Sequence, residues 1–174
     1  VRGDTEDPTG IRSDAPTSSL LAFHVLCSLA ANKRWKLHGA DAANAHLQSK
    51  NIQRFLILAA PDPPPPGTEP GALYRARRAI YGTRDAGRAF WEHLVEALGD
   101  GGWAQSQLEK CMYFFRDSAG QVMGDCTSHV DDILLTGDEN SSEWVAEKEG
   151  LRDLLHLTVN REAFRYCDKN IRQD

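Results

Sequence analysis

The sequence predicts an α+β fold in which an antiparallel sheet packs against two or three helices. Two stretches, 17–31 and 90–98, carry apolar residues at helical spacing. Short β-prone runs separated by turn residues fill much of the second half, which is typical of antiparallel strands. With 174 residues, 41% of them hydrophobic, the chain can bury one core in one or two lobes.

The N-terminal part predicts a lead-in followed by a helix. Residues 1–16 are expected to be extended and poorly packed, because they are polar and interrupted by Gly3, Pro8, Gly10 and Pro16. The helix over 17–31 can be capped by the hydroxyl of Thr17 or Ser18.

A strand over 35–41 is indicated by a period of two. Asp41 falls on the same strand face as Trp35 and Leu37. A carboxylate at the end of an apolar strand face suits a metal site at the rim of a sheet. The alternative is that Asp41 only ends the strand or caps the short segment 42–47.

A proline-rich run, residues 61–70, follows a short strand candidate at 54–60. Consecutive prolines favour an extended, stiff backbone. We expect a loop inside one domain rather than a domain boundary. A docking motif for an aromatic-lined groove is the weaker alternative.

A basic stretch comes next, with five arginines and a single acid, Asp85, between positions 75 and 88. Tyr74 and Tyr81 lie among the arginines. Positive charge beside aromatic rings suits phosphate contact and base stacking, although such a cluster can also be a solvated face. The arginines are Arg75, Arg77, Arg78, Arg84 and Arg88.

The second half predicts a helix at 90–98, two strands at 111–116 and 121–130, a helix capped by Ser141 or Ser142, and a closing hairpin at 158–171. Asp131 and Asp132 stand at a hairpin tip between β-prone runs. Two like charges repel there unless a cation is present, and hard divalent cations prefer carboxylate oxygens. A solvated turn is the alternative.

Three blocks carry a family resemblance. Val130-Asp131-Asp132 resembles the Val-Asp-Asp hairpin of reverse transcriptases. Residues 35–48 resemble the Asp-Val-x-x-Ala-Phe-Leu block of copia-type retrotransposon polymerases, and residues 79–91 resemble their Leu-Tyr-Gly-Leu-Lys block. The order of the blocks is that of the family, and weaker likeness extends over nearly the whole chain. The resemblance therefore implies one domain, 1–174, that is a partial palm and fingers.

The resemblance implies an RNA-directed DNA polymerase that uses two Mg²⁺ (or Mn²⁺) ions. Asp41, Asp131 and Asp132 would be catalytic and hold the metal, at the edge of a three- or four-stranded sheet. His46, Tyr81 and Gly82 would bind the nucleotide, and the five arginines the nucleic acid. The implied partners are an RNA or DNA template-primer, deoxynucleoside triphosphates, and the rest of the polyprotein: thumb, RNase H and integrase.

Three departures from the family pattern support an alternative, a catalytically degenerate remnant that is inactive or only binds nucleic acid. His46 stands where an aromatic is usual, Gly87 replaces a proline, and Asp168 replaces a glycine. The formal net charge of −5 is also unusual for a nucleic-acid binder.

The remaining features bound the compartment. The four cysteines, Cys27, Cys111, Cys126 and Cys167, show no Cys-x-x-Cys spacing, so free thiols are expected. We see no signal peptide and no apolar run of membrane-spanning length. An intracellular protein, cytoplasmic or nuclear, without membrane contact is the expectation.

Overall fold

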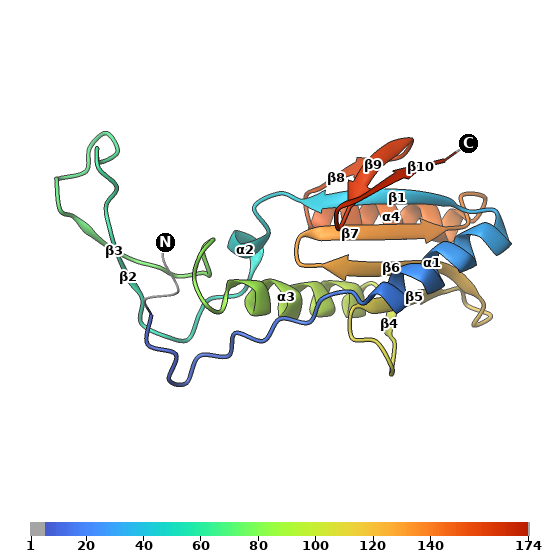
Figure 1. Ribbon diagram of the computed structural model, residues 1–174, viewed down its shortest axis with the longest axis horizontal. Coiled ribbons are helices and arrows are strands. Elements are labelled where there is room, and N and C mark those ends of the chain that lie inside the picture. Colours follow the sequence, from blue (N-terminus) through green and yellow to red (C-terminus); the bar gives the residue numbers. More distant parts are fainter. Residues whose placement is uncertain (1–5, 174) are drawn as a thin grey trace.

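The computed structural model describes residues 6–173, and a six-stranded antiparallel sheet is its centre (Figure 1). The predicted α+β class is confirmed, but the sheet is wider than the three or four strands expected. Residues 1–5 of the predicted lead-in and residue 174 lie outside the described residues. In spatial order the strands are β4 (Ala104–Gln105), β5 (Met112–Arg116), β6 (Val122–His129), β7 (Asp132–Gly137), β1 (Lys36–Ala42) and β8 (Leu157–Asn160).

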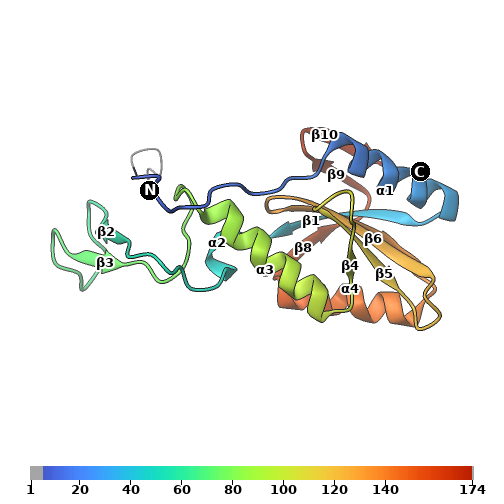
Figure 2. The same ribbon diagram turned by 90° about the horizontal axis from the view of Figure 1, so that it is seen from below.

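Helices cover both faces of this sheet (Figure 2). One face packs against α1 (Leu20–Lys33), and the other packs against α3 (Ala86–Asp100) and α4 (Ser142–Leu154). Successive strand residues point to opposite faces. Ile133 and Leu135 accordingly join the α3/α4 cluster, and Leu134 between them packs with Leu26 of α1.

The start of α1 differs from the prediction by a few residues. The N-cap is Ser19, whose hydroxyl accepts a hydrogen bond from the Ala22 N–H at 3.1 Å. Neither Thr17 nor Ser18 caps the helix. The reason is tertiary: the Ser18 N–H donates to the Ser128 carbonyl at 2.9 Å, which keeps residue 18 extended along β6.

The lead-in also differs from the prediction, because residues 6–16 are anchored to the body (Figure 2). Arg54 pairs with Glu6 at 3.1 Å, and Arg88 pairs with Asp14 at 3.1 Å. α3 starts at Ala86, earlier than predicted. A Cβ on Gly87, in its first turn, would lie 3.2 Å from the Cβ of Ala15, so glycine permits the close approach of the lead-in.

The predicted closing hairpin divides into two parts. Residues 157–160 form β8, which joins the edge of the main sheet beside β1. β9 (Ala163–Tyr166) and β10 (Lys169–Arg172) form a separate hairpin. Phe164 lies over Gly39 of β1, where an added Cβ would come within 2.3 Å of a ring atom and is therefore excluded. Local alternation could not distinguish a strand that joins the sheet from one that crosses it.

A second small hairpin, β2 (Ile57–Ala59) with β3 (Leu73–Arg75), stands away from the body (Figure 1). The proline-rich run 61–70 lies in the connection between these two strands. Within the described residues, no helix is long and apolar enough to span a membrane.

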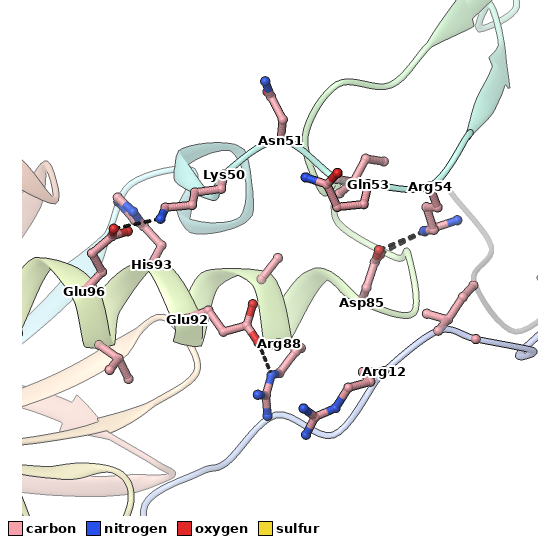
Figure 3. Close-up of a pocket in the computed structure, with 15 residues that line it drawn as sticks. Arg12, Lys50, Asn51, Gln53, Arg54, Asp85, Arg88, Glu92, His93 and Glu96 are labelled. Carbon is pink, nitrogen blue, oxygen red and sulfur yellow. Dashed lines mark hydrogen bonds and ion pairs between the residues drawn. The ribbon is translucent and has the colours of Figure 1, made fainter.

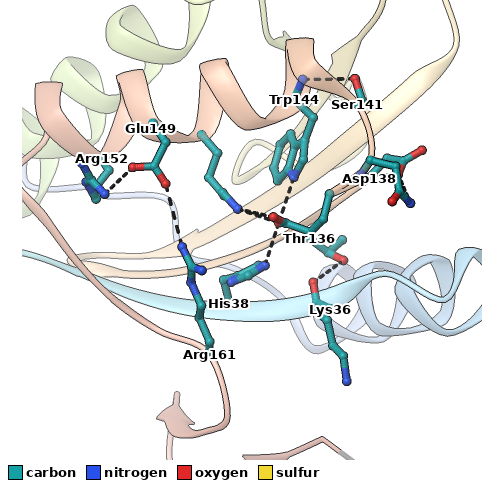
Figure 4. Close-up of polar contacts among 12 residues, drawn as sticks. Lys36, His38, Thr136, Asp138, Ser141, Trp144, Glu149, Arg152 and Arg161 are labelled. Carbon is teal, nitrogen blue, oxygen red and sulfur yellow. Dashed lines mark hydrogen bonds and ion pairs between the residues drawn. The ribbon is translucent and has the colours of Figure 1, made fainter.

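A polar network fixes α4 against the sheet (Figure 4). The buried Lys148 ammonium donates to both carboxylate oxygens of Glu139, at 2.6 and 2.7 Å. The Trp144 indole N–H also donates to Glu139, at 3.3 Å. Burial raises the pKa of Glu139, but these donors outweigh it and the net shift is downward. The His38 Nε2 atom lies 3.1 Å from Glu139 without hydrogen-bond alignment.

The α1 side of β6 contains an uncompensated buried carboxyl group, Asp125. The side chain is fully buried, and within residues 6–173 neither oxygen forms an aligned hydrogen bond. Burial raises the pKa of Asp125 to about 8, and the Cys126 N–H offsets only part of the shift. Thr127, two residues on and therefore on the same face, donates to the Ser18 hydroxyl at 2.8 Å.

Candidate functional site

The three predicted carboxylates lie at one rim of the main sheet, around the turn between β6 and β7. Asp132 is the cross-strand partner of Asp41 on β1. Directly paired residues of antiparallel strands share a face, so both side chains project to the same side. Asp131 lies in the turn, and its carbonyl accepts a hydrogen bond from the Ala42 N–H at 3.2 Å. That bond ties the turn to the strand that carries Asp41.

The turn itself is strained at Val130, whose φ of 57° lies in the left-handed region. β-branched residues rarely adopt this conformation, which costs on the order of 1–3 kcal/mol and is typical of functional sites. The pairing of His129 with Asp132 on one side, and the Ala42 bond on the other, hold the backbone there. The strain fixes the direction in which the chain presents Asp131.

Electrostatic repulsion among the carboxylates is visible at Asp132. Burial raises its pKa, the Cys167 N–H opposes this, and the charges of Asp131 and Asp41 raise the pKa further. Each negative charge therefore disfavours ionisation of its neighbour. A cation at this rim would relieve the repulsion.

The residues fit a Mg²⁺ ion that is shared with a substrate rather than one held by protein alone. Within residues 6–173, no group of three or more His, Cys, Asp or Glu side chains could hold a metal by itself. Mg²⁺ at phosphate-handling sites commonly takes one or two carboxylates and completes its shell with water and phosphate oxygens. Asp41 and Asp131 can supply carboxylates of this kind.

Beside the carboxylates, His46 lies under the ring of Tyr81. His46 belongs to the short helix α2 (Ala45–Gln48), and its ring centroid is 4.1 Å from that of Tyr81. The histidine is 7% exposed, whereas the tyrosine is 45% exposed. Phe90 of α3 closes the other side of the imidazole, 6.5 Å away edge-on.

The charges of the carboxylates reach both rings. Burial lowers the pKa of His46, and Asp131 partly opposes that shift. Burial also raises the pKa of Tyr81, and the charges of Asp131 and Asp41 add to the increase. The predicted catalytic residues and two of the predicted nucleotide-binding residues are therefore neighbours, and Gly82 follows Tyr81 directly.

Comparison with known proteins agrees with this arrangement. The family described as reverse transcriptase (RNA-dependent DNA polymerase) matches residues 9–174. The chain belongs to the copia-type reverse transcriptase family.

Two Arabidopsis thaliana proteins are similar at low identity. The Retrovirus-related Pol polyprotein from transposon RE2 is 26% identical over 129 residues, which cover 72% of this chain and 8% of that protein. The corresponding polyprotein from transposon RE1 is 23% identical over 160 residues, which cover 90% of this chain and 10% of that protein. The chain thus spans about a tenth or less of the curated relatives it matches. No solved structure matches the chain.

In this reverse transcriptase domain the five predicted nucleic-acid-binding arginines do not form one free stripe. Arg75 lies over the Phe55 ring at 5.1 Å, and Arg78 donates to the Leu47 carbonyl at 2.8 Å. Three others have different surroundings: Arg84 donates to the Glu6 carbonyl, Arg88 pairs with Glu92 and Asp14, and the exposed Arg77 shows no side-chain partner among the described residues. Arg77 is thus the arginine most available to a phosphate, and nucleic-acid contact by the group stays a prediction.

The largest cavity of the domain, about 580 Å³, is not at the carboxylates (Figure 3). It lies between the lead-in, residues 50–54 and α3, and none of the three aspartates lines it. Ion pairs cross it, including Arg54 with Asp85 and Lys50 with Glu96. These pairs join the lead-in and α3 to the base of the β2–β3 hairpin, so we assign the cavity a structural role.

Sequence reasoning missed the backbone donor of Cys167. The β9–β10 turn brings this N–H to the Asp132 carboxylate, although the two residues are far apart in the chain. A cavity of about 310 Å³ adjoins the same turn and is also lined by His129 and the start of α1. The only sequence signal was the resemblance of the closing segment to the family. That signal gave the segment but not its contact.

Proposed function

We propose that this chain is an RNA-directed DNA polymerase domain of a retrotransposon polyprotein and that it performs two-metal nucleotidyl transfer. One observation carries the proposal: Asp41 faces Asp132 across β1 and β7, and Asp131 lies in the adjoining strained turn. Three carboxylates at one sheet rim, two of them raising the pKa of the third, form a site that favours divalent cations.

The carboxylates have different roles in this proposal. Asp41 and Asp131 are the principal metal ligands, because Asp132 already faces the Cys167 N–H. Asp132 adjusts the charge of the site. Two Mg²⁺ (or Mn²⁺) ions bound there supply electrostatic stabilisation, by acidifying a primer 3′-hydroxyl and neutralising phosphate oxygens.

The remaining residues position the substrates. Tyr81 and His46 border the nucleotide, which is a deoxynucleoside triphosphate, and Gly82 permits close approach of the backbone. Arg77 and its neighbours contact an RNA or DNA template-primer through phosphates. The thumb and RNase H of the polyprotein are further partners in this proposal.

Metal titration tests the site directly. We expect Mn²⁺ to bind the wild-type domain, and Asp41→Asn and Asp131→Asn each to weaken that binding at least about tenfold, because each removes a charged ligand. Primer extension should fall by about a hundredfold or more in the same variants. Asp117→Asn is a matched control, since Asp117 lies in the distant β5–β6 turn. Equal Mn²⁺ affinity in wild type and both variants would contradict the proposal.

A specific observation also favours the second candidate, a remnant that has lost catalysis. The unpartnered Asp125 carboxyl weakens the sheet that carries the site, and a functional palm gains nothing from it. Intact Mn²⁺ binding without primer extension, in a domain joined to a thumb, would favour this candidate over the polymerase.

A further inference from the structure

The exposed surface beside the carboxylates belongs to Tyr81 and not to His46. The imidazole is enclosed by Tyr81 on one side and Phe90 on the other, and only 7% of the residue is exposed. Tyr81 leaves 45% of its own surface open. A ligand at this rim therefore meets the phenol ring first, and it reaches the imidazole only if that ring moves.

The position of Tyr81 is built into the backbone. Residues 80–83 form a tight turn in which the Ile80 carbonyl accepts from the Thr83 N–H at 3.0 Å and from its hydroxyl at 2.9 Å. Gly82 has a φ of 88°, which the third position of a type II turn requires. Because Thr83 is buried, the turn is anchored from below, and Tyr81 stands at its outward corner.

The imidazole beneath is held as firmly. The His46 carbonyl accepts from the Ser49 hydroxyl at 2.7 Å and from the Ser49 N–H at 3.3 Å, which closes α2. The His46 Nδ1 atom is buried and has no hydrogen-bond partner within residues 6–173. His46 thus acts as a flat support for the tyrosine ring and offers no free polar edge.

The Tyr81 side chain also reaches toward the carboxylates. The charges of Asp131 and Asp41 both act on its hydroxyl, and the Ala45 N–H faces it. The sugar of a nucleotide is one bond from its α-phosphate oxygen. A triphosphate held at Asp41 and Asp131 therefore places its sugar next to the nearest exposed ring, which is Tyr81.

We propose that Tyr81 is the residue that contacts the sugar of the incoming nucleotide and discriminates against a 2′-hydroxyl, and that His46 is a positioning residue that supports its ring. The inference rests on the proposed function and names the residue that sets sugar specificity at that site. A ring packed against the sugar leaves no room for an added hydroxyl group, and loss of such packing typically lowers discrimination about tenfold or more.

Equilibrium binding of dATP and ATP in the presence of Mn²⁺ tests this without requiring catalysis, because the two ligands differ only in the 2′-hydroxyl. We expect Tyr81→Ala to reduce the preference for dATP about tenfold, and Tyr81→Phe, which keeps the ring, to preserve it. His46→Ala should reduce the preference, and His46→Phe should restore it, since a second ring can again support Tyr81. Phe55→Ala, which removes an exposed aromatic elsewhere, is the matched control.

Two outcomes separate this inference from the proposed function. If dATP binds with Mn²⁺ but the Tyr81 variants keep the wild-type preference while His46→Phe increases it, His46 is the contact and the inference is wrong. If neither nucleotide binds the folded wild-type domain, the proposed function itself fails. Circular dichroism verifies folding, and Tyr81→Leu replaces Tyr81→Ala should the smaller side chain unfold the turn.

Discussion

The two faces of the main sheet are held in different ways. Toward α3 and α4, the buried layer consists largely of aromatic and aliphatic groups such as Phe90, Leu98, Ile133 and Trp144. Toward α1, the apolar cluster is smaller, and the same layer of strands includes the fully buried, unpartnered Asp125. The strands that carry the candidate site are therefore supported mainly from one side, and α1 covers a face whose stability depends on protonation.

The largest expected effect concerns the apolar face. Trp144 is fully buried against Gly124 and Gly137, where an added Cβ would lie within 2.2 Å of its ring atoms. We expect Trp144→Ala to lower the free energy of unfolding by about 3–5 kcal/mol, because it opens a large cavity. Urea denaturation measures this. Leu26→Ala on the α1 face, which is expected to cost less, is the comparison; a larger loss there would reverse the order of the two faces.

The next effect is a gain of stability at Asp125. We expect Asp125→Leu to raise the free energy of unfolding at pH 7.5 by about 1–3 kcal/mol, since an unpartnered buried polar group is removed. Thermal denaturation of the two proteins side by side measures it. A loss of stability would mean that the carboxyl group has a partner on folding, and the contrast between the faces would disappear.

The pH dependence of stability should identify the same group. The pKa of Asp125 is about 8 in the folded state against an ordinary value of 3.8, so the folded state binds the proton more tightly. The contribution of this group is fully present below pH 3.8 and is lost as pH rises towards about 8, by on the order of 1 kcal/mol per pH unit. Asp125→Asn cannot ionise. The difference between its urea midpoints and those of wild type should therefore grow from pH 5 to pH 8, and a constant difference would contradict the assignment.

A smaller effect is expected where α1 begins. Ser19→Ala removes the acceptor of the Ala22 N–H and should cost about 1 kcal/mol. Ser19→Asp, which keeps a capping oxygen, should restore most of the loss. Hydrogen exchange of the first turn of α1 measures the effect locally. Equal protection in wild type and Ser19→Ala would show that packing alone holds this end of the helix.

The smallest effect on stability is expected outside the sheet. Replacing Arg77 and Arg78 by Ala should leave the unfolding midpoint nearly unchanged but flatten the salt dependence of binding to a template-primer, because fewer counterions are released. Filter binding at several salt concentrations measures the slope. Lys33→Ala with Lys36→Ala, which removes two charges elsewhere, is the control. An unchanged slope in the arginine variant would mean that the basic stretch is only a solvated face.

Much of the local structure could be predicted from the sequence. Helical spacing at Leu21, Val25 and Leu29 indicated α1, and a period of two placed Asp41 on its strand. The turn at Asp131 and the cap at Ser141 also appear where the residues predicted them. These features depend on neighbours within a few residues, so a local window of sequence contains the information.

Contacts between distant segments were decided only by the tertiary structure. Asp132 faces Asp41, the Cys167 N–H faces Asp132, and Tyr81 covers His46, and each contact joins residues far apart in the chain. The sequence named four of these five residues, but it could not show which ring lies above the other. Packing selects such pairs by the total free energy of the fold, in which each local pattern is compatible with several partners. For the same reason, periodicity did not reveal that Asp125 would be buried without a partner.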